Sequence, residues 1–179
     1  MSNTVEFGLE NVHYATFTID PTTGAYTYDT PKPIRGAVTL AMEPSGSESN
    51  FYADNGVYFA RTANTGYTGT LTIAKLPDSF RTEVLGDVLV AGGLMEASSQ
   101  QTKDIALMFK ISGDVQQDDI IYYDVTVARP NQNANTTSDT VEVGTQDLTL
   151  TAKPRKNDRV IRYVTGELTP PVVKDDFYT

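Results

Sequence analysis

Alternating apolar and polar positions run through most of the chain and predict β-strands. Residues 103–114 alternate most regularly, with a large aliphatic or aromatic side chain at every second position. Because successive side chains of a strand point to opposite faces, such a segment indicates a half-buried strand. Residues 118–130 alternate in the same way, with Ile121, Tyr123, Val125 and Val127 on one face, and are expected to pair with 103–114 as a hairpin. The same pattern predicts further strands at 13–20, 34–42, 66–76 and 140–154, with a bulge at Gly144 and a short edge strand within 159–168.

One segment has helical spacing instead. In residues 76–86, Leu76, Phe80 and Val84 recur at intervals of four, which places them on one face of a helix. Gly86 is a natural C-terminal stop. A helix this short is expected to depend on docking that apolar face against a sheet.

These elements together predict an all-β fold. Seven or eight mostly antiparallel strands and one short flanking α-helix indicate a β-sandwich or open barrel. The length of 179 residues suits one domain. We expect a β-domain over residues 1–162 and an extended C-terminal tail over 163–179. Residues 87–101 are ambiguous, although Gly92–Gly93 predicts a turn.

The strand pattern is interrupted longest at residues 43–65. Within it, Asp54-Asn55-Gly56 carries the Asn-Gly signal of a tight hairpin turn. Four aromatic residues flank that turn: Phe51, Tyr52, Tyr58 and Phe59. We therefore expect an aromatic hairpin carried on a long arm. The pattern leaves open the alternative that the hairpin folds back over its own sheet.

Charge and composition narrow the function. The net charge is −9, which disfavours a protein that grips phosphate backbones with clustered Lys and Arg. The chain has no Cys, so neither a disulfide nor a thiolate metal site is expected. No apolar run approaches the roughly 20 residues of a membrane helix. The N-terminus lacks the basic start and apolar middle of a secretion signal.

Candidate chemistry is sparse. His13 is the single His, and no GxSxG nucleophile motif accompanies it. The adjacent pairs Asp118–Asp119 and Asp175–Asp176 would point to opposite faces of a strand, so neither predicts a metal or acid–base site. The basic cluster 153–159 is expected to pair with acids or to solvate a turn. We expect no enzyme, no cofactor and no metal.

Several stretches, in order, resemble the major tail proteins of long-tailed, non-contractile bacteriophages, above all those of phages infecting Gram-positive bacteria. The resemblance covers about residues 10–155, and "FYADN" (51–55) and "LPDSFR" (76–81) are its most specific pieces. The stretches are "ENVHYATFT" (10–18), "KPIRGAVTLAMEPSGSESNFYADNGVYF" (32–59), "GYTGTLTIAKLPDSFRTEVLG" (66–86), "DIALMFKISGD" (104–114) and "YYDVTVARP" (122–130).

The resemblance implies a structural subunit of a tail tube. Subunits of that family form hexameric rings, the rings stack into a tube, and the genome passes through it. A long loop in the family reaches the adjacent ring, and residues 43–65 occupy its place here. The contact residues would be Phe51, Tyr52, Asp54, Asn55, Gly56, Tyr58 and Phe59.

Further partners and the location also follow from the resemblance. The partners would be other copies of the chain and the tail terminator, tape measure and distal tail proteins. The protein would belong to the virion tail and be made in the host bacterial cytoplasm. DNA would pass without specific binding, because the negative charge of a tube disfavours phosphate binding. Asp104, Asp118 and Asp124 are candidate lumen-facing acids.

Two other functions fit the residues less well. A carbohydrate- or receptor-binding β-sandwich could use exposed tyrosines to stack on sugars, although the chain has no Trp. A small hydrolase would have to rely on His13 alone.

Overall fold

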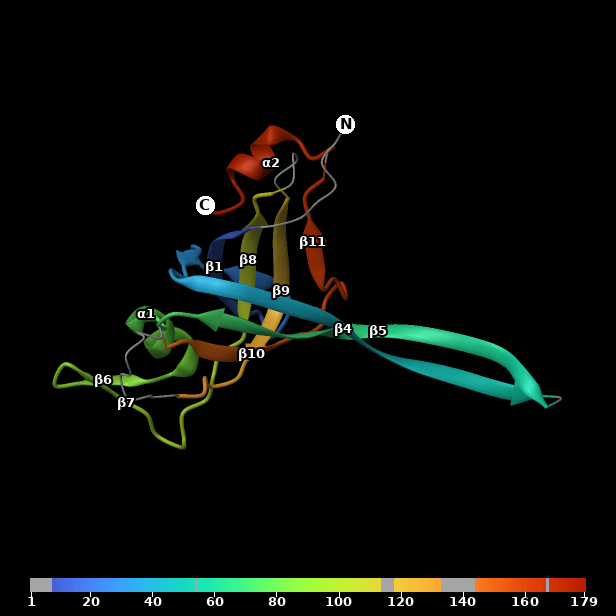
Figure 1. The fold of residues 1–179 in the computed structure, drawn as a ribbon, viewed down its shortest axis with the longest axis horizontal. Helices are drawn as coiled ribbons and strands as arrows, with labels where there is room; N and C mark the ends of the chain where they lie inside the picture. The colour runs from blue at the N-terminus through green and yellow to red at the C-terminus, as the bar shows by residue number, and fades with distance from the viewer. Residues whose placement is uncertain (1–7, 54, 114–117, 133–143, 167) are drawn as a thin grey trace, which may run out of the picture.

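The computed structural model describes residues 8–53, 55–113, 118–132, 144–166 and 168–179. This part of the chain contains eleven strands and three short helical segments (Figure 1). The strands are β1 Leu9–Ile19, β2 Tyr26–Tyr28, β3 Lys32–Pro33, β4 Ala37–Ala53, β5 Gly56–Ile73, β6 Val88–Val90, β7 Gly93–Met95, β8 Ile105–Ile111, β9 Asp119–Val127, β10 Gln146–Ala152 and β11 Arg162–Val164. The helical segments are α1 Asp78–Phe80, the π-helical turn η1 Arg81–Leu85 and α2 Pro171–Asp175.

Nine of these strands form one antiparallel sheet in the order β2–β1–β8–β9–β10–β5–β4, with β3 beside β1 and β11 beside β9. The sheet divides at β9. Its first half pairs with β11 and its second half with β10, so β10, β5 and β4 turn away from the β1–β8–β9 half. In Figure 1, β4 and β5 run across β8 and β9. The two halves enclose the core without closing a barrel, and the predicted fold class is confirmed.

The main core lies between these halves and is covered at one end by α1 and η1. It follows from the predicted alternation: Ile105, Leu107 and Phe109 of β8 and Leu148 and Leu150 of β10 all point into it. Burying each side chain of this size contributes about 1.5–3 kcal/mol to the free energy of folding. The predicted pairing of 103–114 with 118–130 is present as the β8–β9 ladder. Of the segment 140–154, residues 140–143 lie outside the described residues, and Gly144 precedes β10.

The predicted face of 118–130 is wrong in its first half. Tyr122 and Val125 both point into the core, whereas Ile121 and Tyr123 lie on the outer side. The reason is a shift in the β8–β9 register, where Ile105 pairs with Val125 but Leu107 pairs with Tyr122. One extra residue on β9 at this β-bulge reverses the alternation.

The helix is present within the predicted segment 76–86. Its apolar residues Leu76, Phe80, Val84 and Leu85 are all nearly completely buried. Gly86 ends it with φ 80°, the left-handed conformation that favours glycine. The second turn is π-helical, which sequence spacing does not reveal.

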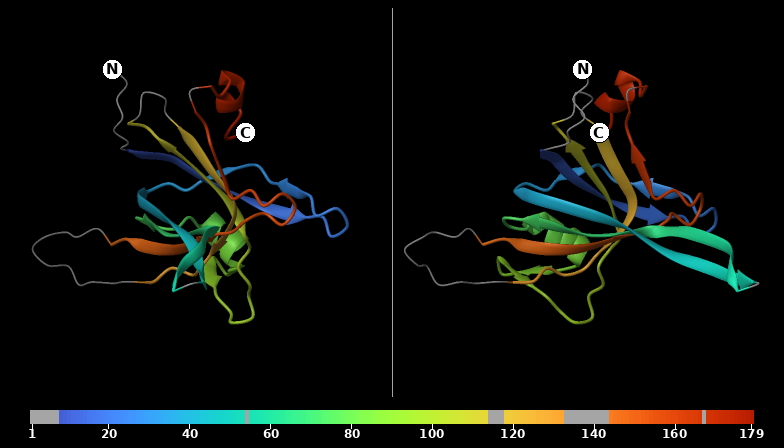
Figure 2. Two further views of the ribbon diagram at one scale, coloured as in Figure 1. Left: turned by 90° about the vertical axis from the view of Figure 1, so that its right-hand side faces the viewer. Right: turned by 45° about the vertical axis from the view of Figure 1, so that its right-hand side comes forward.

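The C-terminal segment differs from an extended tail. Its strand β11 pairs with β9, and its helix α2 is followed by Phe177 and Tyr178, which pack on the outer face of β1 and β8. There the two aromatic residues cover Ala15, Ala106 and Met108. Figure 2 shows α2 folded over the end of the sheet rather than trailing from it.

Candidate assembly surfaces

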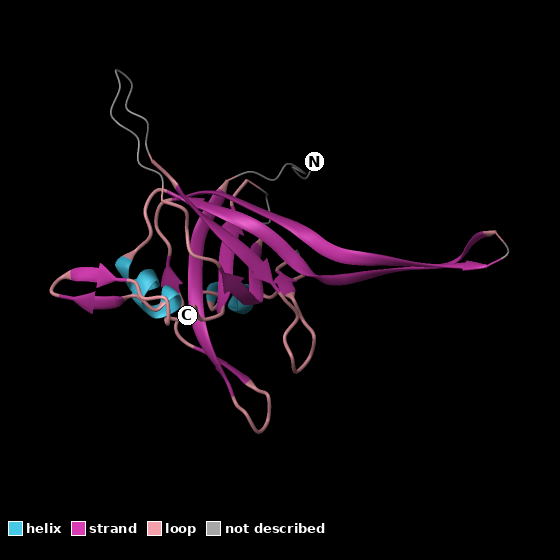
Figure 3. Ribbon diagram, turned by 90° about the horizontal axis from the view of Figure 1, so that it is seen from below, coloured by secondary structure: helices cyan, strands magenta, loops and turns pink. Residues whose placement is uncertain are grey.

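The arm is a continuation of β4 and β5 beyond the body of the protein. The strands stay paired from Ala37–Ile73 to Ala53–Gly56, so the stretches 43–47 and 63–65, expected as loop, are strand. Beyond Gly46 the ribbon continues to the end of β4 at Ala53, a reach of about 25 Å at strand spacing. Figures 1 and 3 show it projecting away from the body, without turning back over its own sheet.

The tip of the arm carries the predicted contact residues. Asn55 takes a left-handed conformation with φ 63°, and β5 begins at Gly56. The side chain of Tyr58 is 76% exposed. Of Phe51, Tyr52 and Phe59 the structure describes the backbone, in which Phe51 pairs with Phe59. Asp54 lies outside the described residues.

The base of the arm depends on a close backbone approach. At Gly66, a Cβ atom would overlap the carbonyl oxygen of Ala152 at the end of β10. Its φ of 146° also lies in a region that side chains rarely adopt. Gly66 therefore allows β5 to pass β10 at the point where the ribbon leaves the sheet.

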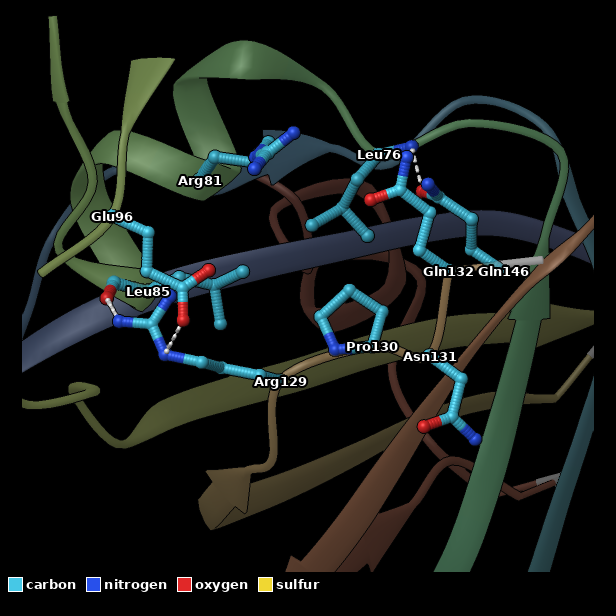
Figure 4. Close-up of a pocket in the computed structure, with 9 residues that line it drawn as sticks. All are labelled: Leu76, Arg81, Leu85, Glu96, Arg129, Pro130, Asn131, Gln132 and Gln146. Atoms are coloured by element: carbon cyan, nitrogen blue, oxygen red, sulfur yellow. Dashed lines mark hydrogen bonds and ion pairs between the residues drawn. The ribbon is translucent and has the colours of Figure 1, made fainter. Parts of the chain in front are cut away.

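A second projection is the β6–β7 hairpin, which has no counterpart among the sequence predictions beyond the Gly92–Gly93 turn. Its ends are held by Arg129, which follows β9. The guanidinium contacts Asp87 Oδ1 at 3.0 Å before β6 and Glu96 Oε1 at 3.1 Å after β7. It also donates to the backbone carbonyl of Leu85 at 2.9 Å. Figure 4 shows the contacts with Glu96 and Leu85 beside a small cavity of about 70 Å³.

Asp87 is the centre of this cluster. Its side chain is fully buried and also accepts a hydrogen bond from Arg81 Nε at 3.0 Å. Burial alone would raise the pKa of Asp87, but the hydrogen bonds and charges of Arg129 and Arg81 outweigh it and hold that pKa below its ordinary value. The carboxylate therefore stays ionised and joins the end of η1 to the hairpin.

Threonines line the outer face of β4, β5 and β10. They alternate with core residues, so their position follows from the strand period. Residues 37–46, 63–73 and 146–152 contain no Lys or Arg. This threonine face is a polar surface formed by Thr39, Ala41 and Glu43, by Thr68, Thr70 and Thr72, and by Asp147, Thr149 and Thr151.

Two of the three candidate lumen acids, Asp104 and Asp124, lie beside this face where β9 pairs with β10, and Asp118 lies at the other end of β9. Asp104 accepts a bond of 2.7 Å from Lys153 Nζ and is partly exposed. Asp124 is buried, 3.6 Å from the same nitrogen, and accepts from the Tyr26 hydroxyl at 3.2 Å. Burial raises the pKa of Asp124, against the lowering effect of Lys153. Asp118 is half-buried at the start of β9.

The other candidate residues make local contacts in the described part of the chain. His13 Nδ1 lies 2.8 Å from the Asn11 carbonyl oxygen, and its ring packs against Tyr178, whose hydroxyl donates to Asp119 at 2.8 Å. Of the basic cluster 153–159, Lys153 pairs with Asp104 and Arg155 with Asp158. Within the described ranges, no cluster of His, Asp or Glu could hold a metal ion. No helix among the described residues is long and apolar enough to cross a membrane.

Comparison with known proteins identifies the family. The model of the family described as phage tail tube protein matches residues 2–175, almost the whole chain. No curated protein matches. The family is a structural one whose members assemble with themselves into a tube, and the resemblance noted in the sequence is thereby confirmed. The chain belongs to the phage tail tube proteins, as a major tail tube protein of a phage with a Gram-positive host and thus a structural component of the virion tail.

Proposed function

We propose that the chain forms hexameric rings, that the rings stack through the β4–β5 arm, and that the genome passes through the resulting tube during ejection. The observation that carries this proposal is the arm itself. A two-stranded ribbon alone is at best marginally stable in water. The ribbon projects from the body without turning back over its own sheet, and Tyr58 near its tip is 76% exposed, so we expect a neighbouring molecule to hold it.

The tip of the arm supplies the contact with the adjacent ring. Tyr and Phe are favoured anchors in protein interfaces because they bury a large area with little loss of conformational freedom. The contact is made by Phe51, Tyr52, Asp54, Asn55, Gly56, Tyr58 and Phe59. The exposure of Tyr58 supports this assignment, since the chain itself leaves that ring in water.

The lumen wall combines the candidate acids with the threonine face. A surface along which DNA slides must offer phosphates few cations, because each Lys or Arg contact adds salt-dependent affinity. The threonine face provides short neutral side chains with Glu43 and Asp147, and Asp104, just before β8, offsets the charge of Lys153 beside it. Asp124 is buried and Asp118 lies at the other end of β9, so both act through the field of the assembled tube.

The remaining partners follow from the same role. A tube of defined length needs a tail terminator, a tape measure protein and a distal tail protein to start and end it, and its subunits are made in the host cytoplasm before assembly. The chain acts without a catalytic step, a cofactor or specific binding of DNA.

Shortening the arm tests the stacking step. Ser47 pairs with Ala63, so replacing residues 48–62 by Asn-Gly closes the ribbon with a tight turn. The variant should keep the unfolding midpoint of the body and form single rings, whereas the full chain forms tubes as its concentration rises. Negative-stain microscopy and analytical ultracentrifugation distinguish the two.

The control is Gly144→Ala, outside the arm at a position where a Cβ meets nothing within 4 Å, and it should stack normally. Tubes of normal length from the shortened variant would remove the arm from the mechanism. A full-length chain that stays monomeric at high concentration would remove the proposed function.

A further inference from the structure

The β6–β7 hairpin exposes apolar side chains that nothing in the described part of the chain covers. Val88 pairs with Met95 and Val90 with Gly93, and these strands form a sheet of their own. Val88, Leu89, Val90 and Met95 are 46–66% exposed. Since Leu89 lies between Val88 and Val90 in one strand, both faces of the hairpin present apolar atoms to water.

A tight turn and a pair of ion pairs brace the two ends of the hairpin. Ala91 and Gly92 have φ of 50° and 82°, the two positive values that a tight type I′ turn requires. At the other end Arg129 joins Asp87 and Glu96, the residues that flank the two strands. An isolated two-stranded hairpin is only marginally stable in water. The tight turn and the ion pairs of Arg129 therefore help to keep the apolar surface ordered before it meets a partner.

Charge favours another copy of the chain as that partner. Residues 88–95 contain no charged side chain, in a protein of net charge −9. Two copies that both carry this charge repel each other, and like charges brought together at an interface are costly. They approach most easily at a surface that is free of charge and apolar.

The position of the hairpin favours a head-to-tail contact. In Figures 1 and 3, β6–β7 and the arm project from opposite sides of the body. A contact between two different surfaces of the same chain propagates from one subunit to the next, as a ring or a stack requires. A two-fold contact of one hairpin with another hairpin would end the assembly at a dimer.

We propose that the β6–β7 hairpin docks on a different surface of a second copy of this chain. This inference rests on the proposed function, because the contact is one of those that build the tube. It adds a contact on the side of the molecule away from the arm.

A single cysteine tests the contact directly, since the natural chain has none. In the Leu89→Cys variant, a small maleimide should label the introduced thiol rapidly in the monomer. In assembled tubes the labelling should slow by about tenfold or more, because a covered thiol reacts only when the contact opens. Tubes dissolved in denaturant give the total thiol. A bifunctional maleimide should produce no dimer in which the introduced thiols of two copies are linked.

The outcomes separate the inference from the proposed function. If the Leu89→Cys variant forms tubes in which its thiol still reacts as fast as in the monomer, the hairpin is uncovered and the inference is wrong while the tube stands. If dimers linked through the introduced thiols accumulate, the contact is two-fold and the inference is again wrong. If the unsubstituted chain forms no assembly, both fail together.

A matched pair of substitutions gives a second readout. Leu89→Asp should raise the concentration needed for assembly by about tenfold or more, since it replaces a Leu side chain at the contact by a charge. Leu168→Asp makes the same change at a 96% exposed leucine near α2 and should leave assembly close to normal. Equal effects of the two substitutions would indicate general charge repulsion and overturn the inference.

Discussion

At the scale of single residues, a buried ion-pair cluster joins segments that are distant in sequence. Asp87 lies 42 positions from Arg129, and its carboxylate is fully buried between that residue and Arg81. Sequence reasoning found the helix stop at Gly86 but missed the ion pair beside it. Asp87 and the two Arg residues belong to no periodic pattern, so nothing in the sequence indicates that they meet. Only the sheet topology brings the end of β9 to the end of η1.

Removing this carboxylate should be costly. In Asp87→Asn, the charges of Arg81 and Arg129 lose their buried partner, and we expect the free energy of unfolding to fall by about 3 kcal/mol. Urea denaturation at pH 7 measures it. Glu96→Gln is the control, because it removes a 54% exposed carboxylate from the same Arg129 and should cost less than about 1 kcal/mol. Equal losses for both variants would contradict a central role for Asp87.

The contribution of Asp87 to the stability of the fold should decrease at acidic pH. The pKa of Asp87 is lower in the folded than in the unfolded protein, so its contribution is fully present above the ordinary Asp pKa and is lost as pH falls through the lowered folded value. The stability difference between the natural chain and Asp87→Asn should therefore be constant at neutral pH. It should shrink as the pH falls below about 4.

At the scale of elements, the sequence was informative where burial imposes a period. The strand β8 and the helix from Asp78 to Leu85 were predicted because one face of each meets the core. The arm was predicted only as a loop with a hairpin at its end, since the ribbon projects beyond the body, where no core imposes an alternation. The first half of β9 was assigned to the wrong face because one bulge residue shifts the period.

The arm base should depend on one glycine. Gly66→Ala places a Cβ against the Ala152 carbonyl oxygen at a φ of 146°, and we expect the free energy of unfolding to fall by about 2 kcal/mol through overpacking and backbone strain. Gly56→Ala, in open space on the same strand, should change it by less than about 0.5 kcal/mol. Thermal and urea unfolding measure both. A harmless Gly66→Ala would mean that β5 can leave the sheet by another path.

At the scale of the whole molecule, charge and contact surfaces act against each other. The net charge of −9 makes free subunits repel one another and, in the proposed tube, would be repeated around every ring. In the proposed contacts, the arm tip and the β6–β7 hairpin would bury apolar area, whose effect does not depend on screening, whereas the repulsion is screened over roughly 8 Å at physiological salt. We therefore expect the concentration needed for assembly to depend more on the repulsion between subunits than on the number of contacts between them.

Salt should consequently promote assembly. Raising the ionic strength from about 0.05 M to about 0.5 M shortens the screening length from about 14 Å to about 4 Å, which removes most of the repulsion between exposed acids of neighbouring subunits. We expect the concentration at which tubes form to fall several-fold, as followed by light scattering and sedimentation. Glu43→Gln removes one exposed carboxylate from the threonine face without touching either core cluster, and should shift assembly to lower salt. If salt instead dissolved the tubes, the copies would be held together by ion pairs, and apolar docking through the arm and the hairpin could not be the main source of cohesion.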